Sequence, residues 1–391
     1  MTGVLEGVKV VDLSSIWAGP GAMMYLADQG ADVVKVEPFG GENGRRTLAT
    51  ADLQDNGPPF LALNRNKRGI VVDIKRPQGK EVVLRLARWA DVFFHNFRPG
   101  VSERLGLGYE DLESMNPRLI YAAIDPFGKR GPYADRPGYD VIFQCLGGSM
   151  HRRMPDGTPI NAGVWVADAS TPMLMAYGIA LALYHRERTG KGQRVEVTLL
   201  HATLAMQNMD LVRVEKEQSQ RPANIGPGNS PYKGKDGQWF FIAVMYDREW
   251  ARLCKALGLE HLIDDPNYKT LLARYENSEP LYYILENIFA TKTRDEWLEV
   301  LTRGDVPCAP ILERSEVLSS PQVTANDMAV TQQHPLAGKV TMVNTPVRLS
   351  AAPGSVRTPA PLLGQHTDEV LRELGYTASE VSRLREQKAV G

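Results

Sequence analysis

The chain has 391 residues, too many for one hydrophobic core of ordinary size, so we expect two domains. Hydrophobic residues make up 43% and charged residues 23% of the composition, which is typical of a globular enzyme. The formal net charge of -1 argues against a general nucleic-acid-binding protein, because the chain has no overall positive field to neutralise phosphates.

Cysteine usage and the apolar segments favour a cytoplasmic protein. Cys145, Cys254 and Cys308 are far apart in the sequence and form no CxxC pair, so neither a disulfide framework nor a metal site is expected. The first residues carry neither a basic stretch nor a long apolar core, so no signal peptide is expected. The most apolar stretch, residues 172–184, is shorter than the about 20 residues that span a bilayer, so no membrane contact is expected.

The first half of the chain alternates short apolar runs with helical segments. Helices are expected over residues 19–29, 77–90 and 109–115. Strands are expected over residues 8–13, 31–37, 69–74, 91–95 and 119–124. This alternation predicts an α/β fold, with an open parallel sheet covered by helices on both faces. Ligands bind such sheets at the carboxyl ends of the strands.

The composition changes in the second half of the chain. Residues 1–205 are expected to form most of a large domain, followed by a polar linker over residues 206–229. Residues 230–330 are expected to form a smaller α+β domain, because hairpin signals precede several helical segments. Residues 331–391 are expected to complete the large domain with returning strands and an amphipathic C-terminal helix.

The turn after the first strand allows a dinucleotide-binding interpretation. Gly19-Pro20-Gly21 supplies two glycines of a GxGxxG fingerprint, and Glu37 could hold a ribose at the end of the second strand. However, Met24 stands where the third glycine is required, and Pro20 has no N–H for a pyrophosphate oxygen. An ordinary turn is therefore favoured, and an NAD-dependent oxidoreductase stays a remote alternative.

Asp168 is the candidate catalytic residue. It follows an apolar run over residues 164–167, which we expect to be a buried strand, and precedes Ser170-Thr171-Pro172 at the start of a helix. One interpretation is a helix-terminal acid, with Ser170 or Thr171 as the cap. The other is a nucleophile for covalent acyl transfer, kept ionised by the helix dipole, with free backbone N–H groups nearby to stabilise an oxyanion.

Several stretches stand out together, in order along nearly the whole chain. They are GVKVVDLSSIWAGP, GADVVKVEP, LNRNKRGIVVDIK, NFRPGVSERLGLGYEDL, NPRLIYAAIDPFGKRGPY, PGYDVIFQCLGG, ADASTPM, HRERTGKGQRVEVTLL, DVPCAPI and PLLGQHTDEVLRELGY. Together they resemble the family III CoA-transferases, the group of formyl-CoA transferase and carnitine CoA-transferase, whose fold also includes the α-methylacyl-CoA racemases. The resemblance implies an interlocked homodimer, in which each chain has a Rossmann-like large domain and a small domain.

The resemblance also implies site residues. Asp168 would be the nucleophile, and Trp17, Tyr139 and Asp140 would lie near the thioester. CoA would be bound by Val72, Asp73, Lys75, Asn96, Phe97, Arg98, Arg104, Pro137 and Gly138. Among these, the basic side chains would form charge-assisted hydrogen bonds with the phosphates of CoA. Four more basic residues could extend the same patch: Arg45, Arg65, Lys67 and Arg68.

The sequence departs from formyl-CoA transferase at several positions. Trp17 replaces a polar glutamine near the thioester, and Pro38 stands where that enzyme has an arginine for CoA. Its glycine-rich loop over the active site has no counterpart, since residues 226–232 form a shorter loop, although residues 226–230 or Gly147-Gly148 could still close over the site. Formyl and oxalyl substrates are therefore not expected, and Trp17 predicts a less polar or differently shaped acyl pocket.

Transferase activity is favoured over racemase activity. The racemases carry histidine in a Gly-His-Asp stretch that matches Gly138-Tyr139-Asp140, and tyrosine is a poor base at neutral pH. The expected substrates are an acyl-CoA and a small carboxylic acid, with CoA as substrate and no tightly bound cofactor. An α-methylacyl-CoA racemase remains the alternative, and a non-catalytic CoA-binding protein is a further one.

Overall fold

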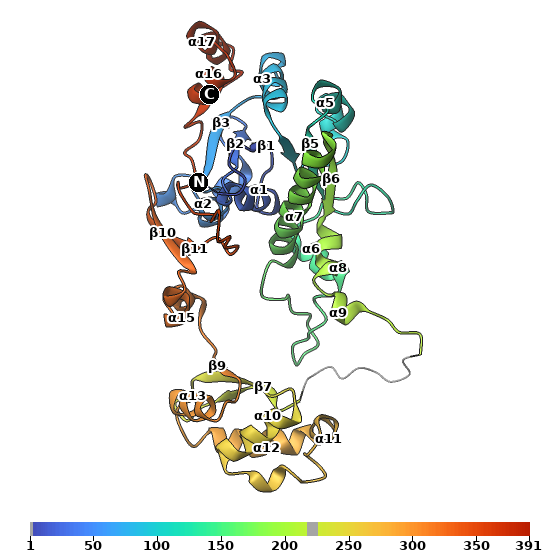
Figure 1. Cartoon of the computed structure of the whole chain (residues 1–391), viewed down its shortest axis with the longest axis vertical. Helices are drawn as coiled ribbons and strands as arrows, with labels where there is room; N and C mark the ends of the chain where they lie inside the picture. The colour runs from blue at the N-terminus through green and yellow to red at the C-terminus, as the bar shows by residue number, and fades with distance from the viewer. Residues whose placement is uncertain (1–2, 217–225) are drawn as a thin grey trace. The chain divides into compact units, whose positions relative to one another are not determined.

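The computed structural model describes residues 3–216 and 226–391, which form two compact units (Figure 1). The large unit extends to Val212 and resumes with Pro321–Gly391. The small unit is Arg213–Ser320. The polypeptide therefore leaves the large unit once and returns to it.

The stretch expected as a linker, residues 206–229, contains secondary structure at both ends. The helix α9 (Asn208–Leu211) lies in the large unit, and the strand β7 (Asn229–Lys233) begins within the small unit. Residues 217–225 lie outside the described residues. The helix α15 (Pro321–Ala325), expected in the small domain, belongs to the large unit.

Six parallel strands form the sheet of the large unit, in the order β3-β2-β1-β4-β5-β6. They are β1 (Lys9–Asp12), β2 (Asp32–Glu37), β3 (Lys67–Val71), β4 (Val92–His95), β5 (Ile120–Asp125) and β6 (Gln193–Thr198). The α/β prediction is confirmed, and β6 adds an edge strand that the apolar pattern does not predict. The strand order reverses between β1 and β4, which is where such sheets bind ligands.

Helices cover both faces of this sheet (Figure 1). Successive strand residues face opposite sides, so Val10 packs with one helix layer and Val11 with the other. The layer against Val10 contains α1 (Ala18–Asp28) and α7 (Val166–Thr189). The opposite layer contains α3 (Pro77–Trp89), α5 (Tyr109–Met115), α16 (Thr367–Glu373) and α17 (Ala378–Glu386). The C-terminal helices thus pack on the large unit, as predicted.

The helix α7 is long and apolar enough to cross a membrane by length and composition, with a mean hydropathy of 1.4. It extends beyond residues 172–184, so the expectation that its apolar stretch is too short is wrong. Met175 and Ile179 of this helix are fully buried in the core with α1. A core helix passes the same test, and this packing accounts for the apolar residues on its buried face.

The other elements of the large unit are short. They are α2 (Pro58–Leu63), α4 (Val101–Arg104), α6 (Asp140–Gly147), α8 (Leu199–Ala205) and the 3-10 turns at Asn43–Arg46 and Ala51–Leu53. The returning strands β10 (Ala329–His334) and β11 (Gly338–Val343) form an antiparallel hairpin. This hairpin forms a sheet of its own and does not extend the parallel sheet.

The small unit has a three-stranded antiparallel sheet, β7-β8-β9, and a helical layer. Its strands after β7 are β8 (Trp239–Ala243) and β9 (Cys308–Pro310). Its helices are α10 (Asp247–Leu257), α11 (Leu271–Glu276), α12 (Ser278–Phe289), α13 (Arg294–Arg303) and α14 (Arg314–Val317), and a 3-10 turn lies at Glu260–Leu262. Large aromatic side chains fill the core between sheet and helices, including Tyr232, Phe240 and Trp250. The unit therefore has a hydrophobic core of its own.

Candidate functional site

Asp168 lies in the first turn of α7, and the residues just before this helix, 160–165, do not form a strand. The side chains of Val164 and Trp165 are 61% and 50% exposed, so the expected buried strand over residues 164–167 is wrong. Apolar residues at these positions therefore form part of the surface beside Asp168. The helix begins at Val166, earlier than the sequence pattern indicates.

The cap of α7 is the buried carboxylate of Asp140, rather than Ser170 or its neighbour. Asp140 Oδ2 accepts the backbone N–H of Ala167 at 2.7 Å and that of Asp168 at 3.1 Å. The side-chain amide of Gln144 donates to the other oxygen of the same carboxylate. These two backbone amides are therefore occupied, and the expectation that they are free to stabilise an oxyanion is wrong. Asp140 instead fixes the position of Asp168.

The pKa of Asp168 is raised to about 7, first by burial of the carboxyl group and then by the nearby charge of Asp140. Both effects disfavour the ionised form. The expectation that the helix dipole keeps Asp168 ionised is therefore wrong in sign. At neutral pH a substantial fraction of the carboxylate is available as a nucleophile, and its desolvation makes that fraction more reactive.

Asp168 lies where two cavities of the large unit adjoin. The central cavity, of about 330 Å³, is lined by Asp168 together with Trp17, Tyr139 and Arg98. The apolar cavity, of about 410 Å³, is lined by the same Trp17 and Asp168 and otherwise by apolar side chains and Tyr25. Asp168 therefore lines both a cavity with polar and charged side chains and a cavity that is mainly apolar.

A third cavity adjoins the central one, because the two share lining residues. This Lys75 cavity, of about 280 Å³, shares Ser15, Asn43 and Phe97 with the central cavity. It lies beyond the carboxyl ends of β1 and β2, as expected for a ligand site in a parallel sheet. Lys75 is the cation in its described lining, beside the carboxylates of Glu37, Glu42 and Asp73, of which the first two are paired with buried cations. Arg98 is the cation in the described lining of the central cavity.

The structure brings together most of the residues that the resemblance implies. Val72, Asp73 and Lys75 line the Lys75 cavity, together with Phe97. The central cavity contains Trp17, Asn96, Phe97, Arg98, Pro137, Gly138, Tyr139 and Asp168. Asp140 lies behind Asp168 as the helix cap. Arg104 is exposed at the end of α4 and lines none of these three cavities.

Two residues that line both polar cavities, Ser15 and Asn43, were not predicted from the sequence as site residues. The Asn96 side chain holds the loop that contains Ser15, since it accepts the Ser15 N–H at 2.9 Å and donates to the Ser15 carbonyl at 2.8 Å. The next residue, Ile16, has a φ of 71°, a strained conformation for a β-branched residue. Its N–H donates to Glu42 at 2.8 Å. Asn96 therefore fixes the backbone of the loop that leads into Trp17.

The four additional basic residues do not extend a phosphate-binding patch. Buried ion pairs hold Arg45 to Glu37 at 2.6 Å, Arg65 to Asp28 at 2.7 Å, and Lys67 to Asp12 at 3.0 Å. Arg68 pairs with Asp32, Glu369 and Glu373. The hypothesis that they contact CoA is therefore wrong, because partners within the fold occupy all four cations.

The dinucleotide interpretation is wrong as well. Glu37 is buried and paired with Arg45, so it is not available to a ribose. The two glycines have packing roles: a Cβ on Gly19 would lie 2.4 Å from that of Ser14. A Cβ on Gly21 would lie 3.1 Å from the Pro172 ring, so this glycine lets α1 approach α7 closely.

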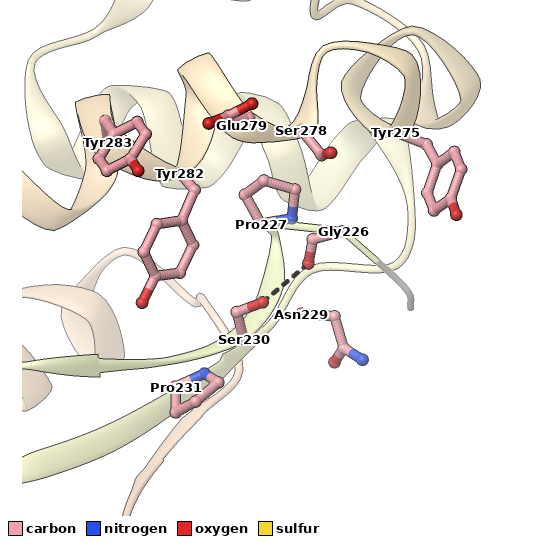
Figure 2. A pocket seen from close by; sticks show the side chains of 10 residues that line it. All are labelled: Gly226, Pro227, Asn229, Ser230, Pro231, Tyr275, Ser278, Glu279, Tyr282 and Tyr283. Carbon is pink, nitrogen blue, oxygen red and sulfur yellow. Dashed lines mark hydrogen bonds between the residues drawn. The ribbon is translucent and has the colours of Figure 1, made fainter. Parts of the chain in front are cut away.

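The small unit contains a further cavity of about 630 Å³, drawn in Figure 2. Tyr282 and Ser230 line it, and the Ser230 hydroxyl donates to the Gly226 carbonyl at 3.0 Å. Among the described residues of its lining, Glu279 is the one charged side chain. The glycine-containing segment expected as a closing loop leads directly into β7. Among the described residues, no cluster of histidine, cysteine and carboxylate side chains could hold a metal ion.

Comparisons with known proteins identify the family. Residues 5–367 match the model of CoA-transferase family III. The succinyl-CoA:glutarate CoA-transferase of Mus musculus is 37% identical over 97% of this chain and 88% of its own length. The formyl-CoA:oxalate CoA-transferase of Streptomyces avermitilis is 36% identical over 98% of this chain and 99% of its own. A CAIB/BAIF family protein from Brucella suis superposes with a TM-score of 0.83 at 35% identity, covering 96% of this chain and 100% of that chain.

A carboxylate that lines two adjoining cavities is an arrangement that acyl transfer can use. The chain belongs to CoA-transferase family III, as its sequence resemblance predicts. It is a CoA-transferase, with acyl-CoA as substrate.

Proposed function

We propose that Asp168 is bonded covalently first to the acyl group and then to CoA, while CoA passes from an acyl-CoA donor to a small carboxylic acid. The observation that supports this role is that Asp168 lines both the central and the apolar cavity. A side chain at such a junction can contact a thioester whose CoA part lies on one side and whose acyl part lies on the other.

The proposed reaction has four steps. The Asp168 carboxylate attacks the thioester carbonyl, which expels CoA thiolate and forms an acyl-aspartyl anhydride. The thiolate then attacks the aspartyl carbonyl, which releases the donor acid and forms an aspartyl-CoA thioester. The acceptor carboxylate attacks the aspartyl carbonyl of this thioester, which releases the thiolate again and forms a second anhydride, between Asp168 and the acceptor acid. Attack of the thiolate on the acceptor acyl carbon gives the new acyl-CoA and restores Asp168.

CoA is proposed to lie along the Lys75 cavity and the central cavity. Lys75 and Arg98 would form charge-assisted hydrogen bonds with its phosphates, since they are the cationic side chains of these two cavities. Phe97, shared by both, offers apolar surface between them. A contact between Arg104 and CoA has less support, because Arg104 lines neither cavity.

The cavity linings favour transfer over racemisation. Racemisation requires a base on each face of the α-carbon. Asp168 is the one carboxylate in the described linings of the central and apolar cavities, and no histidine accompanies it. Tyr139 is 71% exposed, so most of its side chain is open to solvent. These linings offer one base rather than two.

The chain is proposed to act as an interlocked homodimer in the cytoplasm, without a tightly bound cofactor. An exposed apolar stripe on α7 supports association, with Tyr177 and Tyr184 each 63% exposed and Leu181 50% exposed between them. The interlocked arrangement itself is inherited from the family resemblance.

The function is tested by chromatography of CoA esters. The wild-type enzyme, given an acyl-CoA and a second carboxylic acid, should form the second acyl-CoA. Asp168→Asn should abolish this product, while Asp156→Asn, at an exposed loop carboxylate, should leave the rate unchanged. Loss of α-deuterium from a branched acyl-CoA, with no exchange between acids, would contradict a transferase and indicate a racemase.

A further inference from the structure

We infer that the acyl group handled by this enzyme is an apolar monocarboxylate, rather than a dicarboxylate like those in the names of its relatives. The inference rests on the proposed function, because it assigns the acyl part of the substrate to the apolar cavity. It extends that function by naming the chemical class of acid that the cavity selects.

The lining of the apolar cavity carries the argument. Besides Asp168 it consists of Trp17, Gly21, Met24, Tyr25, Leu48, Pro59, Ala62, Leu63, Trp165, Ala169, Pro172 and Met173. This described lining contains no lysine, arginine or histidine. A distal carboxylate that entered the cavity would have no cationic partner there. Burial of an unpaired carboxylate is strongly unfavourable.

The polar groups at the cavity do not compensate for this absence. The indole N–H of Trp17 is buried and has no hydrogen-bond partner in the structure, but a neutral donor of this kind cannot balance the charge of a carboxylate. Trp165 packs edge-on against it, with ring centroids 5.1 Å apart. Burial raises the pKa of Tyr25, which therefore stays neutral and can donate one hydrogen bond at most.

The cation whose charge acts on Tyr25 is held elsewhere. The charge of Arg65 acts on the Tyr25 hydroxyl, but its guanidinium is bound to Asp28 at 2.7 Å and to the Val343 carbonyl at 2.7 Å. Moving it into the cavity would leave the buried Asp28 carboxylate unpaired. Arg65 is therefore not available to a substrate carboxylate.

The cavity mouth is apolar as well. Leu48 is 71% exposed, in a left-handed conformation with φ of 58°, and Met173 is 47% exposed. An apolar acyl chain would remove both side chains from water, which is favourable in proportion to the area covered. A volume of about 410 Å³ lies within the usual range of ligand pockets.

The test compares butyryl-CoA with succinyl-CoA, which differ in the distal carboxylate. With one acceptor acid held fixed, we expect kcat/KM for butyryl-CoA to exceed that for succinyl-CoA at least about 100-fold. From acetyl-CoA to hexanoyl-CoA, kcat/KM should rise by up to about fourfold per methylene. Succinyl-CoA equal to or better than butyryl-CoA, with Asp168 still acylated, would overturn this inference and leave the proposed function intact. Failure of every acyl-CoA to acylate Asp168 would overturn both.

A charge placed at the cavity mouth provides the second test. Met173→Arg should lower kcat/KM for butyryl-CoA at least about tenfold and raise it for succinyl-CoA, because the new cation pairs with the distal carboxylate. Met173→Leu should keep the wild-type preference. The matched control is Leu336→Arg, at a position with 43% exposure in the β10–β11 turn and outside the cavity. An unchanged preference in Met173→Arg would contradict the assignment of the cavity.

Discussion

The Oδ2 atom of Asp140 lies 3.1 Å from the backbone nitrogen of Asp168, and its negative charge opposes ionisation of the Asp168 side chain. One buried carboxylate thus fixes the start of α7 and also raises the pKa of its neighbour. The strained turn at Ile16 positions Trp17 against the same site. The proposed nucleophile, Asp168, therefore lies at a fixed helix start and has a pKa raised to about 7, near neutral pH.

The rate of acyl transfer should depend on ionisation of Asp168. Because only the carboxylate attacks a thioester and the pKa is raised to about 7, we expect kcat/KM to fall about tenfold per pH unit below pH 7. Above pH 7 it should level off. The measurement is a pH profile of kcat/KM with a nonionising acyl group, and a flat profile between pH 5 and pH 8 would show that another group carries the chemistry.

Asp140→Asn should separate the two roles of Asp140. The asparagine oxygen can still accept the backbone N–H groups of Ala167 and Asp168, while the negative charge is lost. The pKa of Asp168 should then decrease, so the acid limb of the kcat/KM profile should move to lower pH. Asp140→Ala should instead lose the cap and about 1 kcal/mol of folding free energy. An acid limb unchanged in Asp140→Asn would rule out an effect of this charge.

Replacement of Asp168 should stabilise the folded protein at neutral and alkaline pH. Its pKa is raised in the folded state, so the folded form loses stability as pH rises from about 4 to about 7, and this loss is complete above that range. Asp168→Asn should remove this loss and raise the free energy of unfolding by about 1–2 kcal/mol at pH 8, with no gain near pH 4. Denaturant titrations at both pH values measure the difference. A gain of the same size at pH 4 would mean that it does not arise from ionisation.

Lys75 and Arg98 should contribute to CoA binding rather than to the chemical step. Replacing either with alanine should raise KM for acyl-CoA about tenfold and change kcat little, since each loses a charge-assisted hydrogen bond to a phosphate. Arg88→Ala is the control, at a position 49% exposed on α3 and outside these cavities. Equal KM values in the alanine variants of Lys75, Arg98 and Arg88 would contradict the proposal that CoA lies along the Lys75 cavity and the central cavity.

Much of the fold follows from local sequence pattern, and the exceptions have physical causes. The strands β1, β2, β4 and β5 are largely apolar and alternate with helices, so they are recognisable as buried parallel strands. The strand β3 begins at Lys67, two residues before the predicted start at Gly69, because its first two residues are basic. The edge strand β6 is amphipathic and only partly buried along its length, so its sequence lacks that signal. Val164 and Trp165 look like core residues but lie on the surface beside Asp168.

The residues of the candidate site could be proposed from short motifs, whereas contacts between residues far apart in the sequence could not. Asp168 and the residues of the polar cavities could be carried over from the family resemblance. The ion pair between Arg65 and Asp28 joins residues far apart in sequence, so Arg65 resembles a free cation until its partner is seen. The apolar cavity likewise combines residues from α1, α2 and α7, which no local pattern connects.

The central claim is that Asp168 is acylated and returns to a carboxylate in each cycle. A single turnover with an acceptor acid labelled with ¹⁸O in both carboxylate oxygens tests it directly, because the bridging oxygen of the second anhydride stays on the aspartate. Mass spectrometry of the peptide that contains Asp168 should then show incorporation of one heavy oxygen. Formation of the new acyl-CoA with an unlabelled Asp168 would contradict the account.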